Sequence, residues 1–122
     1  MKRIFLLTSG VLVFAVMLGC KKNALGGKSH ISGTVMHHSR FIPRARVFIK
    51  FNATEFPGKD TSLYDAKIWA DDLGNYLITC YQGSYYLYAF AYDDQFAKDV
   101  NGGIPVNIRT NENLSLDLAV TE

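Results

Sequence analysis

From His30 onward, apolar and polar residues alternate along the chain with a period of two. The clearest stretches are Ile31–Val35, Ala45–Ile49, Tyr76–Cys80, Ile104–Ile108 and Leu114–Val120. Successive side chains of a β-strand point to opposite faces, so this alternation is typical of strands that bury one face. No segment after the first 19 residues shows the sustained repeat of an amphipathic helix. The pattern therefore constrains the chain to an all-β fold.

Turn-forming residues separate the alternating stretches and divide them into seven expected strands. Clusters of Asp, Asn, Gly and Ser at 71–75, 82–84, 101–103 and 110–113 mark the turns. The expected strands are 30–37, 45–51, 63–69, 76–81, 85–92, 104–109 and 114–120. Short strands joined in this way predict a single seven-stranded antiparallel β-sandwich. The only long connection expected inside it runs from Asn52 to Ser62.

The N-terminus has the features of an export signal. Lys2 and Arg3 precede an uncharged, apolar run from Ile4 to Leu18, which is shorter than the ~20 residues of a membrane-spanning helix. The run ends in Met-Leu-Gly-Cys at 17–20, which resembles the lipobox of bacterial lipoproteins. That resemblance implies cleavage after Gly19 and fatty acylation of Cys20, so that lipid on Cys20 anchors the protein to a membrane.

The organisation expected from these features has three parts: a lipoprotein signal peptide at 1–19, a flexible polar tether at 20–29 and the sandwich at 30–122. Lys2 and Arg3 account for two of the 13 basic residues, which leaves 11 to balance the 11 acidic residues. A formally neutral mature chain lacks the basic excess of a nucleic-acid-binding domain, so no nucleic-acid partner is expected.

Four motifs in the expected domain resemble the carboxypeptidase regulatory-like family. They read Ile-Ser-Gly-Thr-Val at 31–35, Ile-Pro-Arg-Ala-Arg-Val at 42–47, Asp-Asp-Leu-Gly-Asn-Tyr at 71–76 and Gly-Ser-Tyr-Tyr-Leu-Tyr-Ala at 83–89. The resemblance implies the prealbumin-like, or transthyretin-like, sandwich. It also implies an accessory module of the kind found on envelope proteins of Bacteroidetes-type bacteria. The motifs specify turns and core positions, and they do not specify a molecular activity.

No constellation of residues predicts catalysis, and we expect no catalytic, cofactor-binding or metal-binding residues. His37 and His38 are adjacent, so in an extended strand they point to opposite faces and chelate one ion poorly; His30 lies at the other end of that strand. The pairs Asp71-Asp72 and Asp93-Asp94 offer oxygen ligands for Ca²⁺, but Asp at strand ends more often caps turns. Cys80 ends an apolar strand pattern and is interpreted as a small buried side chain.

The most unusual segment is the aromatic strand at 85–92, Tyr-Tyr-Leu-Tyr-Ala-Phe-Ala-Tyr. The family pattern places Tyr85, Leu87 and Ala89 inward, which leaves Tyr86, Tyr88 and Phe90 in a row on the other face. An exposed row of rings is a possible ligand face, able to stack on a glycan or on a partner protein. The alternative is that the connection from Asn52 to Ser62, together with Phe51 and Phe56, covers these rings as a second small core.

Together these observations predict a non-enzymatic, lipid-anchored protein of the bacterial cell envelope, expected on the outer membrane, with an accessory or interaction module as its folded part. A glycan-binding or ligand-binding module using Tyr86, Tyr88 and Phe90 is the first alternative. A hydrolase is a less favoured one.

Overall fold

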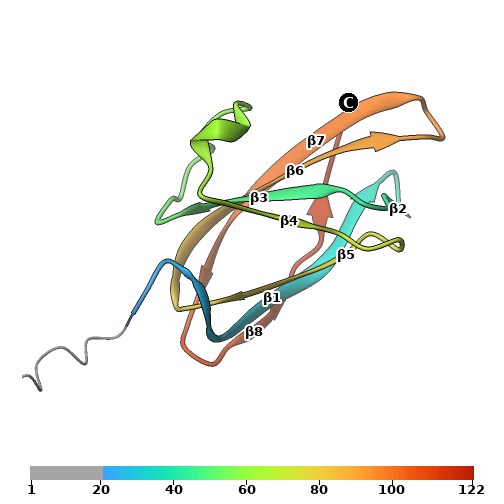
Figure 1. The fold of residues 1–122 in the computed structure, drawn as a ribbon. Helices are drawn as coiled ribbons and strands as arrows, with labels where there is room; N and C mark the ends of the chain where they lie inside the picture. Colours follow the sequence, from blue (N-terminus) through green and yellow to red (C-terminus); the bar gives the residue numbers. More distant parts are fainter. Residues whose placement is uncertain (1–20) are drawn as a thin grey trace, which may run out of the picture.

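The computed structural model describes residues 21–122, and these residues form two β-sheets in a sandwich-like arrangement (Figure 1). Within this range the only helical segment is the 3-10 helix η2 (Thr61–Leu63). Among the described residues, no helix has the length and apolar character needed to cross a membrane. The predicted signal peptide and lipidation site, residues 1–19 and Cys20, lie outside the described residues.

The first sheet is built around one long strand, β1 (Leu25–His37). Strands β2 (Arg40–Phe41) and β5 (Asn75–Cys80) pair with β1 in antiparallel orientation. Strands β8 (Asn113–Ser115) and β9 (Leu118–Ala119) pair with β1 in parallel orientation. The expected all-antiparallel arrangement is therefore wrong for the C-terminal segment.

The second sheet has the order β4-β3-β6-β7, and all its neighbouring strands are antiparallel. Its strands are β4 (Ala66–Trp69), β3 (Arg46–Phe51), β6 (Gly83–Asp93) and β7 (Lys98–Ile108). Strands β6 and β7 are the longest of this sheet and form a hairpin (Figure 1). The C-terminal segment crosses from the first sheet to this one, because Thr121 forms an isolated antiparallel bridge with Asn101 of β7.

The core lies between the two sheets and follows the predicted alternation. Tyr85, Leu87 and Ala89 of β6 are fully buried and point inward, as predicted. They pack with Ile31 and Val35 of β1 and with the inward residues of the other strands. Cys80 is a free, fully buried cysteine, which confirms its interpretation as a small core side chain.

The structure has nine strand segments in the described range rather than the seven predicted. The hairpin strand β2 was not expected, and the last expected strand is split into β8 and β9. The split occurs where the backbone of Leu116 approaches Gly33 so closely that a Cβ atom on Gly33 would lie 1.9 Å from the Leu116 carbonyl oxygen. The Leu116 amide donates to the Ser32 carbonyl at 2.7 Å, and its carbonyl accepts the hydroxyl of Tyr76. The close approach therefore depends on glycine at position 33.

The expected tether is also shorter than predicted, because residues 25–29 already belong to β1. Just before them, the Asn23 amide donates to the Gln82 carbonyl at 2.9 Å, and the Ala24 amide donates to the Tyr85 hydroxyl at 2.9 Å. These bonds attach the segment to the sandwich from Asn23 onward. The sequence analysis missed this because the polar, glycine-rich segment at 25–28 resembles a flexible linker. Both glycines have positive φ angles, lie against the Tyr81 ring and fall where the register of β1 shifts relative to β5.

The predicted turn at 71–75 is confirmed. Gly74 has φ +76°, a conformation that glycine adopts without strain. The Asp71 carboxylate accepts hydrogen bonds from the amides of Leu73 at 2.8 Å and Asn75 at 2.9 Å. Asp71 therefore caps the turn, as its position predicted.

Candidate functional site

The predicted ligand face on β6 is largely covered. Tyr86 and Tyr88 do point outward from the second sheet, but they are only 9% and 2% exposed. Phe56 lies with its ring centroid 5.8 Å from that of Tyr86 and 5.5 Å from that of Tyr88. Tyr64 stacks on Tyr88 at 5.6 Å with an interplanar angle of 16°. The prediction of an exposed row formed by Tyr86, Tyr88 and Phe90 is therefore wrong for Tyr86 and Tyr88. The structure instead contains the alternative, a second small core.

The loop that covers these rings is held by its own hydrogen bonds. Asp60 caps η2 by accepting hydrogen bonds from the Ser62 hydroxyl at 2.8 Å and from the Ser62 amide at 3.0 Å. The hydroxyl bond first, and the amide bond after it, hold the pKa of the Asp60 carboxyl below its usual value. The Tyr64 hydroxyl donates to the Gly58 carbonyl at 2.9 Å. Phe51 was expected to join this cover, but it points inward and meets Tyr85 edge-on at 5.9 Å. The cover therefore comes from Phe56 and Tyr64.

Beyond the loop, the same face carries a row of side chains that is not covered. The strand register places Trp69, Arg46, Phe90 and Asn101 directly opposite one another across the four strands of the second sheet. Trp69 is 59% exposed, and the other three are partly exposed. The Arg46 guanidinium lies 5.1 Å from the Phe90 ring and 5.9 Å from the Trp69 ring. Cation–π contacts thus hold Arg46 between two aromatic rings.

A shallow hollow of about 290 Å³ lies between this row and the loop. The row contributes Arg46, Phe90 and Asn101, and the loop contributes Lys59 and Thr61. A second hollow of about 260 Å³ shares Lys59 and Asn101 and extends over the glycines of β7. Aromatic faces, cationic groups and an amide together can stack on a sugar ring and donate hydrogen bonds to its hydroxyl or carboxylate oxygens. The loop therefore covers part of the aromatic strand and also forms one wall of this hollow.

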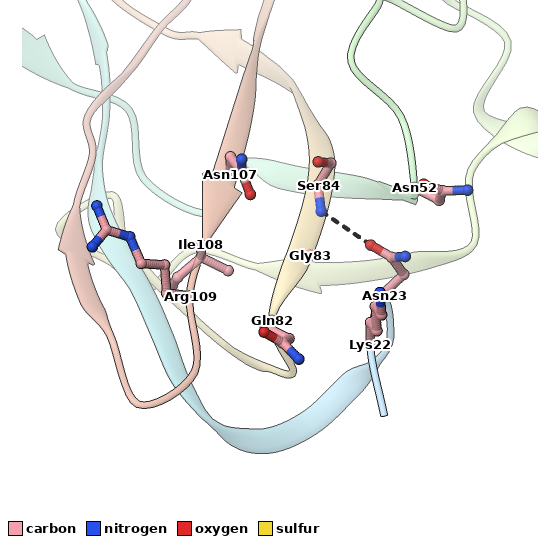
Figure 2. Close-up of a pocket in the computed structure, with 9 residues that line it drawn as sticks. All are labelled: Lys22, Asn23, Asn52, Gln82, Gly83, Ser84, Asn107, Ile108 and Arg109. Carbon is pink, nitrogen blue, oxygen red and sulfur yellow. Dashed lines mark hydrogen bonds between the residues drawn. The ribbon is translucent and has the colours of Figure 1, made fainter. Parts of the chain in front are cut away.

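The end of the sandwich where the described residues begin has a polar pocket of about 350 Å³ (Figure 2). Its lining residues are Lys22, Asn23, Asn52, Gln82, Gly83, Ser84, Asn107, Ile108 and Arg109. One of its amides is already used, because the Asn23 side-chain oxygen accepts from the Ser84 amide at 3.0 Å. Figure 2 shows the guanidinium of Arg109 well apart from the amides of Asn23 and Asn52. Its polar groups do not converge on one point, so we interpret this pocket as the attachment of the N-terminal segment.

The opposite end is closed by a buried polar pair that joins the two sheets. His37 is the last inward residue of β1 and Asp93 the last of β6, and they are 3% and 2% exposed. The His37 Nδ1 and Asp93 Oδ2 atoms lie 2.6 Å apart, and an Arg40 nitrogen lies 3.7 Å from the other carboxylate oxygen. The bond from His37 holds the pKa of the Asp93 carboxyl below its usual value.

The expectation that His37 and His38 point to opposite faces is wrong. Their ring centroids are 4.1 Å apart, because the chain leaves the strand at His38, where φ is +52°. His30 is not part of this group, since its ring bonds the Thr79 hydroxyl at 3.1 Å. Sequence reasoning missed the contact because alternation holds only while the backbone remains extended.

The two acidic pairs do not form paired oxygen sites. Asp71 caps its turn, while Asp72 forms an exposed ion pair with Arg44 at 2.7 Å. Asp93 is buried against His37, whereas Asp94 is exposed. In each pair the two carboxylates therefore have different hydrogen-bond partners or different burial, and they do not form a shared oxygen site.

Comparison with known proteins gives a likeness at the level of the fold. Neither a protein-family model nor a curated protein matches the sequence. Among solved structures, a DUF3823 family protein from Parabacteroides merdae is similar, with a TM-score of 0.50 and 13% sequence identity over 79% of this chain. The chain spans about half the length of that protein, 47%. The likeness supports the all-β architecture.

Proposed function

We propose that this protein is a lipid-anchored protein of the bacterial cell envelope whose prealbumin-like sandwich is a binding module, not an enzyme, and that the module binds glycans. The observation that carries the proposal is the open row of Trp69, Arg46, Phe90 and Asn101 beside the loop hollow. Two rings, a guanidinium and an amide on one sheet face provide both the stacking surface and the hydrogen-bond donors that a sugar needs.

The prealbumin-like assignment is supported by the roles of the motif residues. Asp71 and Gly74 form the turn that their motif requires, and Tyr85, Leu87 and Ala89 of the last motif are core residues. The membrane anchor is supported by the lipobox-like sequence ending at Cys20 and by the exposed cations that follow it, Lys21 and Lys22. Basic side chains beside a lipid anchor add attraction to anionic headgroups, ~1 kcal/mol each.

Glycan binding is tested on an array of bacterial and plant polysaccharides with the wild type and two matched variants. Trp69→Ala removes the most exposed ring of the row, and we expect affinity for any bound glycan to fall about tenfold or more, which corresponds to ~1.4 kcal/mol. Phe41→Ala is the control, because Phe41 is a 44% exposed ring on β2 of the other sheet. A wild type that binds no polysaccharide, or equal loss in both variants, would refute the proposed activity.

The anchor is tested separately by metabolic labelling with palmitate. The wild type should incorporate label and fractionate with membranes, and Cys20→Ser should do neither. Labelling that persists in Cys20→Ser would exclude this residue as the acylated one.

A further inference from the structure

We propose that His37, His38 and Glu122 form a binding site for a divalent transition-metal ion, best suited to Zn²⁺, at the end of the sandwich closed by Asp93. Each of the three side chains offers one ligand atom, and these atoms lie within 4.8 Å of one another. Two imidazoles and one carboxylate are a ligand set that Zn²⁺ accepts, with a fourth position left for water or another ligand.

The tight turn after β1 brings the two imidazoles together. Strands β1 and β2 pair through Met36 with Phe41 and His37 with Arg40, so His38 and Ser39 are the two residues of the loop. Both have positive φ angles, +52° and +65°, as a two-residue hairpin turn requires. The turn rotates the His38 ring toward that of His37.

Asp93 prepares His37 for this role. A carboxylate only accepts hydrogen bonds, so the 2.6 Å contact means that His37 Nδ1 carries the proton and donates it to Asp93. The lone pair of Nε2 is then the one available to a cation. Asp93 is itself fixed by the Gln95 amide, which donates at 2.9 Å. A carboxylate behind a histidine is the usual outer support of a metal-binding imidazole, since it fixes both the tautomer and the ring orientation.

Glu122 is brought to the site by the bridge between the C-terminal segment and β7. The amide of Thr121 donates to the Asn101 carbonyl at 2.9 Å, and the Asn101 amide donates to the Thr121 carbonyl at 2.8 Å. These reciprocal bonds fix the backbone next to Glu122. The Glu122 carboxylate now pairs with Lys98 at 3.2 Å, and this exposed ammonium is the cation that a metal ion would displace.

The remaining adjustment needed to hold an ion is small. With metal–ligand distances of ~2.0–2.2 Å, tetrahedral ligand atoms lie ~3.3 Å apart, and the three ligand atoms here already lie within 4.8 Å of one another. His38 and Glu122 are exposed and can rotate to reach tetrahedral positions, while the buried His37 stays fixed. Phe96 contacts both imidazoles, with centroids 5.5 Å from His37 and 5.3 Å from His38, and forms an apolar wall.

The test uses the full chain in detergent, freed of any oligohistidine tag, with Zn²⁺ followed by calorimetry and Co²⁺ by its visible absorption. We expect one ion per chain and the intense Co²⁺ bands of a four-coordinate site. Asp93→Asn should weaken binding about 10–100-fold, and loss of a direct ligand in His38→Ala should weaken it at least as much. Glu122→Gln should also weaken binding, whereas Lys98→Ala should preserve or tighten it.

His30→Ala is the matched control, because His30 lies on the same strand but bonds Thr79 instead. It should bind Zn²⁺ like the wild type. His38 and Glu122 are exposed, so these two variants are expected to fold even if Asp93→Asn does not. Absence of stoichiometric binding in the wild type, or equal binding by His38→Ala, Glu122→Gln and the wild type, would overturn the site.

Discussion

The two faces of strand β6 bury aromatic and aliphatic side chains in different ways. On the inner face, Tyr85, Leu87 and Ala89 are fully buried against the first sheet, whose strands come from distant parts of the sequence. On the outer face, Tyr86 and Tyr88 are buried by one loop, through Phe56 and Tyr64. The inner face is thus part of the global fold, whereas the outer face depends on a local cover.

This difference determines where the molecule can bind something. Removing the inner cover would require unfolding, because both sheets contribute to it. The outer cover ends before Phe90, and the uncovered part of that face holds Trp69 and Arg46. An apolar outer face therefore becomes a candidate binding surface only where the loop stops.

The largest effect is expected from shortening a side chain on the inner face. Leu87→Ala removes a fully buried side chain of the core and should lower the free energy of unfolding by ~2–5 kcal/mol, measured by urea denaturation. Leu77→Ala is the matched control, because Leu77 is 59% exposed and its loss should change stability by less than ~0.5 kcal/mol. Equal losses in the two variants would contradict the assignment of the inner face.

The inner face was predictable from sequence, and the outer one only in part. The resemblance to the carboxypeptidase regulatory-like family implied that Tyr85, Leu87 and Ala89 face inward, and alternation alone could not choose the face because the segment at 85–92 is apolar on both sides. The long connection from Asn52 to Ser62 offered a cover for the other face, and Phe56 provides it. Phe51 was misassigned because it belongs to β3, whose register with β6 sets it beside Tyr85 on the inner side.

The candidate sites depend on register, which sequence does not supply. Trp69, Arg46, Phe90 and Asn101 lie on four strands and become neighbours only through pairing. A signal was present, because Trp69 is the only tryptophan of the sequence. Lys67 precedes it by two residues and so lies on the same face of the strand, where its ammonium is 5.5 Å from the Trp69 ring. His37 and Asp93 are 56 residues apart, and their contact requires both sheets to be in place.

A smaller effect is expected from opening the outer cover. Phe56 is 48% exposed, so Phe56→Ala loses mainly its contacts with two tyrosine rings and should cost ~1 kcal/mol. Hydrogen exchange should become faster in residues 52–64, while the inner residues of β6 keep their protection. Trp69→Ala, which also removes an exposed ring but covers no tyrosine, should leave exchange in the loop unchanged. A global loss of protection in Phe56→Ala would mean that the loop is part of the main folding unit.

Ionisation of the tyrosines has the smallest effect on folding stability at neutral pH. It also compares the two faces directly, because each face contains a buried tyrosine. Burial raises the pKa of Tyr85, on the inner face, to about 12, and burial together with Tyr88 and Tyr86 raises the pKa of Tyr64, in the outer cover, to about 12. Both groups titrate near 10 when unfolded, so their neutral forms contribute stability that is complete below pH ~10 and is lost as the pH rises toward 12.

Urea denaturation at several alkaline pH values should therefore show a decline in the free energy of unfolding that begins near pH 10. Tyr64→Phe loses the hydroxyl bond to Gly58, a small cost at pH 7 of ~0.5–1.5 kcal/mol, but it should have a shallower alkaline decline than the wild type. Tyr85→Phe should show the same shallower decline. It should also lower the free energy of unfolding at pH 7, because the Ala24 amide and the Tyr81 carbonyl lose their hydrogen bonds to the Tyr85 hydroxyl. If Tyr64→Phe retains the full decline while Tyr85→Phe does not, the outer cover opens before its tyrosine ionises. The two faces would then differ in how readily each is exposed to solvent, and not only in which part of the chain covers them.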